Sequence, residues 1–157
     1  MVAALNPNNY RILKWLAWII FLGYSACLFY WMFRGFGRTT REGFSYNLMP
    51  LTTIFSYIFN MNRHNIGTTI INLAGNIGVF MPFGVILPFI FEKLRRYSLF
   101  LACFTGSILI LEFMQTVLRV GTGDIDDVIL NDIGASAGFI LYRFCVAKRS
   151  RDGKTDF

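Results

Sequence analysis

The segment GDIDDVILNDIGASAGFILYRF, residues 123–144, combines four carboxylates with an apolar run long enough to enter a lipid bilayer. Three of the acids precede the run, and Asp132 lies inside it. A carboxylate within a spanning helix costs roughly 3 kcal/mol on insertion scales, so such residues usually turn toward the interior of a helix bundle and find a partner there. The segment therefore predicts a membrane helix that begins in a polar site.

The composition of the whole chain indicates a membrane protein. Of 157 residues, 55% are hydrophobic and 15% are charged, whereas soluble domains carry about 25% charged residues. Four runs of at least 19 residues contain no more than two charges each, and a spanning helix needs roughly 20 apolar residues. We expect an all-α integral membrane protein that forms a single domain over residues 1–157. Its four transmembrane helices are predicted at about 12–33, 68–91, 97–118 and 126–147, followed by a cytoplasmic tail at 148–157.

The loop after the first span contains an amphipathic stretch, NLMPLTTIFSYIFN, residues 47–60. Its apolar residues recur close to the i, i+3, i+4, i+7 pattern of a helix over about 48–60. A helix of about 12 residues is too short to span, so we expect it to lie in the membrane interface or to re-enter from the outer side. In either position it would cover the polar side chains of the neighbouring spans.

The distribution of basic residues predicts the orientation. With the N-terminus inside, ten of the fifteen Lys and Arg residues fall in inner segments and five in outer ones, which is the expected bias. Both termini are therefore predicted to be cytoplasmic, and the first loop to be external. The arginines of that loop could meet lipid phosphates or simply flank the helices; they are Arg34, Arg38, Arg41 and Arg63.

Three of the predicted spans carry polar side chains in the half that this orientation places outside. We predict that these side chains contact a ligand in one shared space: Asn72, Asn76, Glu112, Gln115, Asp124, Asp127 and Asn131. Glu112 and Gln115 are three residues apart, which places them on one helix face. The same holds for Asp127 and Asn131, which are four apart.

Structural roles compete with ligand binding for these acids. Asp124 can accept hydrogen bonds from the free N–H groups of a first helical turn, and Asp126 and Asp127 suit the positive end of the helix dipole. Glu112 could form an interhelical hydrogen bond, which contributes about 0.6–2 kcal/mol. Capping accounts for about two of the carboxylates, and the convergence of the remaining polar groups favours a functional site.

Small residues predict close helix packing. Gly75 and Gly78 interrupt the second span, and GASAG, residues 134–138, has the small-xxx-small spacing on the fourth. The three cysteines fall within spans, where a thiol behaves as a small hydrophobe, so we expect no disulfide and no cysteine metal site.

Four motifs in order resemble those of the VanZ-like membrane proteins: NLMPLTTI (47–54), NLAGNIGVFMPFG (72–84), EFMQ (112–115) and GDIDDVILNDIGASAG (123–138). The resemblance covers about residues 47–138. It implies a multi-pass protein of the bacterial cell membrane and low-level resistance to teicoplanin, a glycopeptide bearing a fatty acyl chain, without a matching effect on vancomycin. It implies no established reaction. Asp132 departs from the family, which more often has threonine or another small residue there.

Three classes of function remain open. The first is a non-catalytic protein that binds membrane lipids, a lipoglycopeptide antibiotic or an envelope lipid precursor in an outer-leaflet pocket. The second is an enzyme that modifies an envelope lipid or glycan precursor, with a divalent cation held by Glu112, Asp124 and Asp127 or with Glu112 and Asp127 as acid and base. The third is a scaffold whose polar core sets register. We favour the first, and expect no cofactor and no nucleic-acid partner.

Overall fold

The computed structural model of the protein describes the backbone of residues 7–35, 40, 42–60 and 65–152. Five α-helices account for most of these residues. Their order, with a 3-10 helix η1 and two short strands, is α1 (Pro7–Phe33), β1 (Tyr46–Asn47), α2 (Thr52–Phe59), α3 (Ile66–Ile90), η1 (Glu92–Arg95), α4 (Tyr97–Val117), β2 (Gly123–Asp124) and α5 (Ile125–Asp152).

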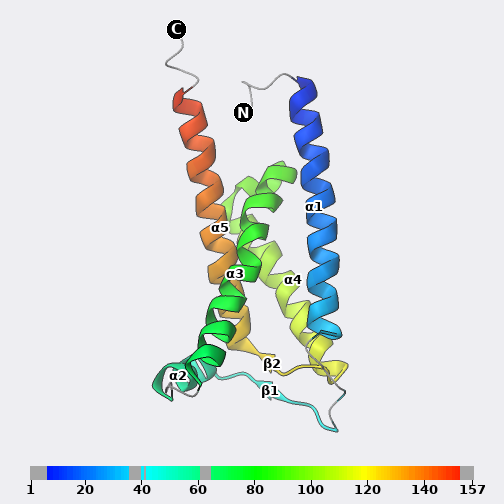
Figure 1. Cartoon of the computed structure of the whole chain (residues 1–157), viewed down its shortest axis with the longest axis vertical. Helices are drawn as coiled ribbons and strands as arrows, with labels where there is room; N and C mark the ends of the chain where they lie inside the picture. Colours follow the sequence, from blue (N-terminus) through cyan, green and yellow to red (C-terminus); the bar gives the residue numbers. More distant parts are fainter. Residues whose placement is uncertain (1–6, 36–39, 41, 61–64, 153–157) are drawn as a thin grey trace.

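Four of the described helices are long and apolar enough to cross a membrane, which confirms the predicted all-α fold with four spans. The crossing segments are Asn8–Phe33, Ile66–Ile90, Tyr97–Val117 and Ile125–Val146. The start of α1 and the end of α5 lie at one end of the bundle, and α2, β1 and β2 lie at the other (Figure 1). We call this second end the strand end.

The helix ends differ from the predicted bounds in ways the sequence explains. Helix α1 begins at Pro7, five residues earlier than expected, because proline has no N–H to leave unpaired and is tolerated in a first turn. Helix α5 continues to Asp152, so the first part of the predicted tail is helical. Residues 153–157 lie outside the described part of the chain.

Helix α2 is shorter than the predicted 48–60. Leu51 adopts a left-handed conformation with φ 68, immediately after Pro50, and the helix begins only at Thr52. None of its side chains is buried, and Phe59 is 79% exposed. An apolar helix with an uncovered face suits the membrane interface, and its position there stays a prediction.

Helices α3 and α5 approach so closely that glycine is required between them. A Cβ built at Gly134 would overlap the carbonyl oxygen of Ile77, one at Gly138 that of Met81, and one at Gly84 that of Ala135. We call these three glycines the glycine seam.

The seam confirms the packing role predicted for GASAG. The same prediction is wrong for Gly75 and Gly78, because a Cβ at either position would meet nothing within 4 Å. These two glycines lie on α3 but away from its contact with α5.

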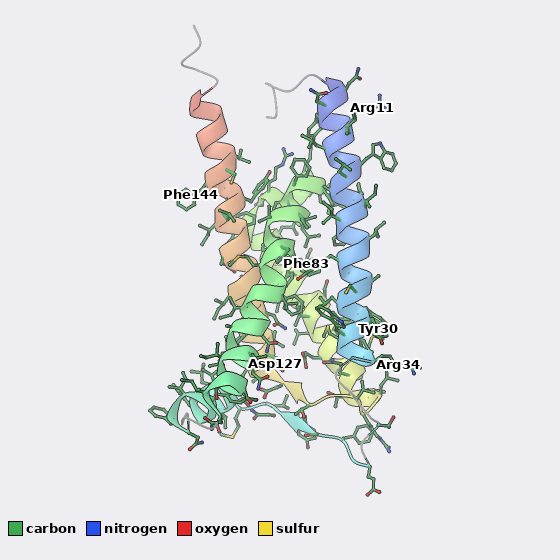
Figure 2. All side chains as sticks on the ribbon, in the orientation of Figure 1. Arg11, Tyr30, Arg34, Phe83, Asp127 and Phe144 are labelled. Atoms are coloured by element: carbon green, nitrogen blue, oxygen red, sulfur yellow. The ribbon has the colours of Figure 1, made fainter. Side chains whose placement is uncertain are left out.

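Aromatic side chains fill the core between α3, α4 and α5. The rings of Phe100 and Phe139 have centroids 5.0 Å apart, and Phe104 packs edge-on against Phe80 at 5.9 Å. Figure 2 shows Phe83, another member of this cluster, near the middle of the bundle.

Helix α1 is attached more loosely than the other spans. Only 6% of its apolar span is buried, against 44% for α5. Hydrogen bonds from side chains to the main chain contribute to its attachment: Tyr24 Oη donates to Val79 O at 2.8 Å, and Gln115 Nε2 donates to Met32 O at 2.7 Å.

Replacing Gly138 by leucine is expected to lower the stability by about 1–3 kcal/mol, because the new side chain must displace the main chain at Met81. The thermal unfolding midpoint of the purified protein in detergent measures the loss. Gly75→Ala is the matched control: a Cβ has free space there and alanine is the better helix former, so the midpoint should stay or rise. A Gly138→Leu protein as stable as the parent would contradict the seam.

Candidate functional site

A two-stranded parallel pair joins the first loop to the segment that precedes α5. Tyr46 pairs with Gly123 and Asn47 with Asp124, and the Gly123 N–H donates to Ser45 O at 3.1 Å, which extends the ladder by one residue. The strands lie beside α2 at the strand end (Figure 1). This pairing brings the acids at the start of the fourth span against the loop that was predicted to cover them.

Asp124 caps its own helix, as predicted, and also binds the first loop. Its Oδ1 accepts from the Asp126 N–H at 2.9 Å, which is the N-cap bond of α5. Its Oδ2 accepts from Thr53 Oγ1 at 2.6 Å, and Asn47 Nδ2 donates to Oδ1 at 3.3 Å. The side chain is 8% exposed. Much of its hydrogen-bonding capacity therefore holds the strand end together.

Asp126 caps a different helix from its own. The residue is completely buried and accepts hydrogen bonds from three main-chain N–H groups at the start of α2: Leu51, Thr53 at 2.7 Å and Ile54 at 3.0 Å. A carboxylate in this position satisfies the unpaired donors of a first turn and complements the helix dipole. Sequence reasoning had placed Asp126 only against its own helix and had not counted it among the site residues.

The two asparagines of α3 bind different partners. Asn76 Nδ2 donates to Asp127 Oδ1 at 2.6 Å, which links α3 to α5 (Asp127 is labelled in Figure 2). Asn72 Nδ2 donates to Tyr57 Oη at 2.9 Å, which links α3 to α2. Both amides lie in the half of α3 that is nearer the strand end.

Glu112 and Asp124 line one cavity of about 360 Å³ between α4, β1 and the start of α5. We call it the polar cavity after its two carboxylates, although most of its exposed lining is apolar. Glu112 is 8% exposed. Apolar side chains complete the wall, and two of them, Leu109 and Phe113, also lie on the exposed face of α4, where Phe113 is 69% exposed. The described residues that line it are Tyr46, Leu48, Leu109, Glu112, Phe113, Thr116, Gly123, Asp124, Ile125 and Val128.

Gln115 and Asn131 do not line the polar cavity. Gln115 turns toward α1 and donates to Met32 O. Asn131 is 1% exposed, and its Oδ1 has no hydrogen-bond partner among the described residues. The seven predicted site residues therefore divide among the cavity (Glu112 and Asp124), the α3 contacts (Asn72, Asn76 and Asp127), the attachment of α1 (Gln115) and a buried position on α5 (Asn131).

The three carboxylates considered for a divalent cation do not come together. Within the described part of the chain, no group of three or more His, Cys, Asp or Glu side chains is arranged to hold a metal ion. Glu112 and Asp124 share the polar cavity, whereas Asp127 binds Asn76 on the α3 side of α5. The three cysteines are free.

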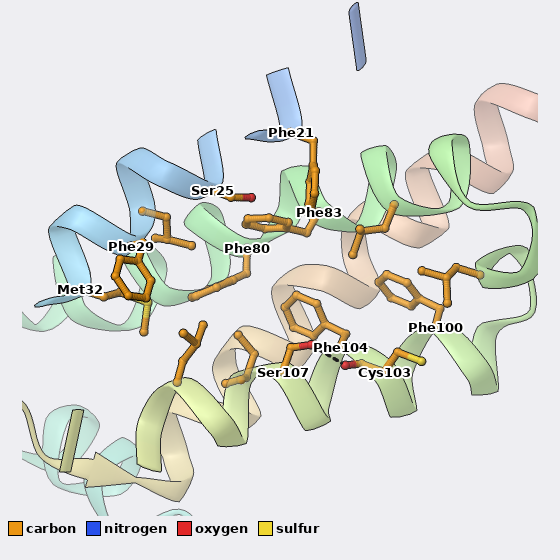
Figure 3. A pocket seen from close by; sticks show the side chains of 15 residues that line it. Phe21, Ser25, Phe29, Met32, Phe80, Phe83, Phe100, Cys103, Phe104 and Ser107 are labelled. Atoms are coloured by element: carbon orange, nitrogen blue, oxygen red, sulfur yellow. Dashed lines mark hydrogen bonds between the residues drawn. The ribbon is translucent and has the colours of Figure 1, made fainter. Parts of the chain in front are cut away.

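A second cavity, of about 330 Å³, lies between α1, α3 and α4 on the opposite face of α4 (Figure 3). We call it the apolar cavity. Rings such as Phe21, Phe80 and Phe104 surround it, and none of the described residues that line it is charged. Two hydroxyls, Ser25 and Ser107, belong to its wall, and Ser107 donates to Cys103 O at 2.8 Å.

The four apolar spans and the acidic cavity at one end define a polytopic helical membrane protein. A family model described as VanZ/LLP1 matches residues 16–146, and the chain belongs to this family. Protein VanZ of Enterococcus faecium is 29% identical over 92 residues, which are 54% of this chain and 56% of that protein. The match thus spans about half the length of this relative. No solved structure matches the chain significantly.

Asp126→Asn is expected to release the start of α2, because an amide keeps one acceptor oxygen but turns a donor toward the N–H groups of the helix. Hydrogen bonds to a charged group contribute about 1.5–3 kcal/mol, so amide exchange in residues 52–59 should accelerate about tenfold or more. Hydrogen exchange read by mass spectrometry measures this, and the spanning helices should keep their protection.

Asp132→Asn is the control for this experiment. Asp132 lies on the same helix but accepts from Thr105 Oγ1 of α4 at 2.8 Å, a bond that asparagine can also accept. Exchange in α2 should then equal that of the parent protein. Identical α2 exchange in Asp126→Asn and the parent would show that the cap does not hold the helix.

Proposed function

We propose that this protein binds the headgroup of a membrane amphiphile in the polar cavity, and that this binding gives low-level protection against teicoplanin. The observation that carries the proposal is the composition of the cavity wall: two largely buried carboxylates stand beside apolar side chains that continue onto the exposed face of α4. A wall of this kind suits a molecule with a polar head and apolar chains.

Glu112 and Asp124 would receive the polar end. Both are hydrogen-bond acceptors, and none of the lining residues that the structure describes is Lys or Arg, so this wall favours amine and hydroxyl donors. Leu109 and Phe113 would contact the start of the apolar chains on the lipid side. Three kinds of molecule combine a polar head with apolar chains in this way: a membrane lipid, an envelope lipid precursor and an acylated glycopeptide.

The orientation of the chain belongs to the same proposal. The first described residues of α1 and the last of α5 share one end of the bundle (Figure 1), so both termini are expected on one side of the membrane. The excess of basic residues near that end supports a cytoplasmic location. The polar cavity at the opposite end would then open at the outer leaflet, where a glycopeptide antibiotic meets the cell.

Binding without catalysis has more support than metal-dependent catalysis. The carboxylates considered for a common cation are not grouped: Glu112 and Asp124 line the cavity, and Asp127 binds Asn76 of α3. The described residues contain no group of three potential metal ligands. The membership in the VanZ/LLP1 family supports the link to teicoplanin, which is the expectation drawn from its sequence motifs.

Glu112→Gln is expected to abolish protection when the chain is expressed in a susceptible host, because the amide turns a donor into the cavity and removes the carboxylate. The minimum inhibitory concentration of teicoplanin should fall to that of the host without the protein, and that of vancomycin should not change. Asp127→Asn should have the same effect by weakening the bond to Asn76.

The control is Glu92→Gln. Glu92 belongs to η1 between α3 and α4, its side chain is 68% exposed, and its ion pair with Arg95 at 3.6 Å contributes little at such exposure. Protection should persist, with equal amounts of all three variants in the membrane. Full protection by both Glu112→Gln and Asp127→Asn would place the function elsewhere.

A further inference from the structure

The apolar cavity has the size of a ligand site rather than of a packing gap. Its volume is about 330 Å³. Protein interiors are close-packed, and their few gaps rarely exceed the size of a water molecule. Pockets that bind small molecules usually measure roughly 300–1,000 Å³. The cavity is therefore large enough to take a substantial part of a ligand.

The wall of this cavity suits hydrocarbon. Its inner part consists of buried apolar side chains such as Phe80, Phe104 and Ile108. The described residues that line it include no charged side chain, and their hydroxyls are those of Ser25 and Ser107. A buried water needs about three hydrogen bonds, and an unpaired ionic group in an apolar site costs free energy. The wall is thus poorly matched to water or to a charged ligand and well matched to an apolar chain.

The cavity opens at the surface between α1 and α4. Three residues of its wall are exposed: Phe29 on α1, and Cys103 and Ser107 on α4. Both helices are long and apolar enough to cross the membrane, so their outer surfaces at this depth face the hydrocarbon of the bilayer. A molecule that reaches the cavity through this opening therefore comes from the bilayer core.

The attachment of α1 leaves this side of the helix accessible. Its rings pack along α3, where the Trp18 and Phe91 centroids are 5.3 Å apart. The bond from Gln115 to Met32 O joins α1 to α4 at the strand end. From there the two helices diverge toward the other end of the bundle (Figure 1). The space between them is a wedge that a chain from the bilayer can enter sideways.

The cavity is elongated along the helix axes. Its wall extends from Phe21 to Met32 on α1 and from Phe100 to Leu111 on α4. Each stretch corresponds to roughly 16 Å of helix. The hydrocarbon core of a bilayer is roughly 30 Å thick, so one leaflet contributes about half of that. The length of the cavity therefore matches one acyl chain that extends through one leaflet.

We propose that the apolar cavity binds one acyl chain of a membrane phospholipid, which enters between α1 and α4 and lies along the helix axes. The chain contacts Phe29 of α1 and Phe104 of α4 and so joins two helices that diverge from each other. Its headgroup stays outside the cavity, at the membrane surface. The site lies on the opposite face of α4 from the polar cavity, and it does not depend on the function proposed for that cavity.

Photochemical crosslinking in lipid vesicles tests the proposal. The full chain is reconstituted in phosphatidylcholine vesicles with a phosphatidylcholine that carries a diazirine in the middle of one acyl chain, and adducts are located by mass spectrometry of peptides. Surrounding lipid reaches exposed residues such as Ile110 in any case. We expect additional adducts on Phe104 and Ile108, which are buried and line the cavity. Phe139, equally buried but outside the lining, is the internal control and should carry none.

Ser107→Trp is expected to lower the adduct yield at Phe104 and Ile108 at least fivefold, because the indole occupies the opening of the cavity. The hydroxyl that is lost bonds only within α4, to Cys103 O, so the thermal midpoint should stay close to that of the parent protein. Ile110→Trp is the matched control: Ile110 belongs to the same helix, is 62% exposed and does not line the cavity. Its yield at Phe104 and Ile108 should equal that of the parent.

Two results would overturn the proposal. Adducts of the parent protein that are confined to exposed side chains would show that no acyl chain enters the cavity. Equal labelling of Phe104 and Ile108 in Ser107→Trp and the parent would show that a chain reaches them by another route than the opening between α1 and α4. Neither result would bear on headgroup binding in the polar cavity, which lies across α4.

Discussion

The close approach of α3 and α5 is the constraint on which the rest of the structure depends. Because Gly84, Gly134 and Gly138 carry no side chain, each backbone lies against carbonyl oxygens of the other helix. The seam fixes the height of α5 relative to α3, and so places Asp127 opposite Asn76. The seam also positions the first turn of α5 relative to α3. The acids before that point reach the first loop only because the seam holds the helix there.

The acids at the start of α5 have structural roles, and under the proposed function one of them would also contact a ligand. Asp126 accepts hydrogen bonds from N–H groups at the start of α2. Asp124 caps α5 and also accepts a hydrogen bond from Thr53 Oγ1. Burying an unpaired carboxylate at a membrane boundary costs free energy. Hydrogen bonds from main-chain N–H groups offset this cost without a positively charged side chain. What remains for a ligand is the cavity face of Asp124 together with Glu112, which arrives from α4. The proposed binding would thus rely on a polar framework that also holds the loop.

Sequence reasoning reached the features that depend on local pattern. The lengths of the apolar runs predicted the four spans, and the spacing of small residues predicted two of the seam glycines, Gly134 and Gly138. It missed features that depend on pairing between distant segments. The bonds from Asp126 to α2 cross more than 70 residues, and no local motif distinguishes them from an ordinary dipole interaction. Gln115 lies three residues after Glu112, so the two were predicted to share a helix face. In the structure Gln115 instead donates a hydrogen bond to Met32 O of α1.

The central claim is that a polar headgroup occupies the cavity lined by Glu112 and Asp124. A high-resolution structure determined by electron cryomicroscopy in lipid nanodiscs tests it most directly. The account predicts headgroup density within hydrogen-bonding distance of Glu112, with acyl density continuing past Leu109 and Phe113. Density for acyl chain alone against Glu112, or a cavity closed by the surrounding side chains, would contradict it.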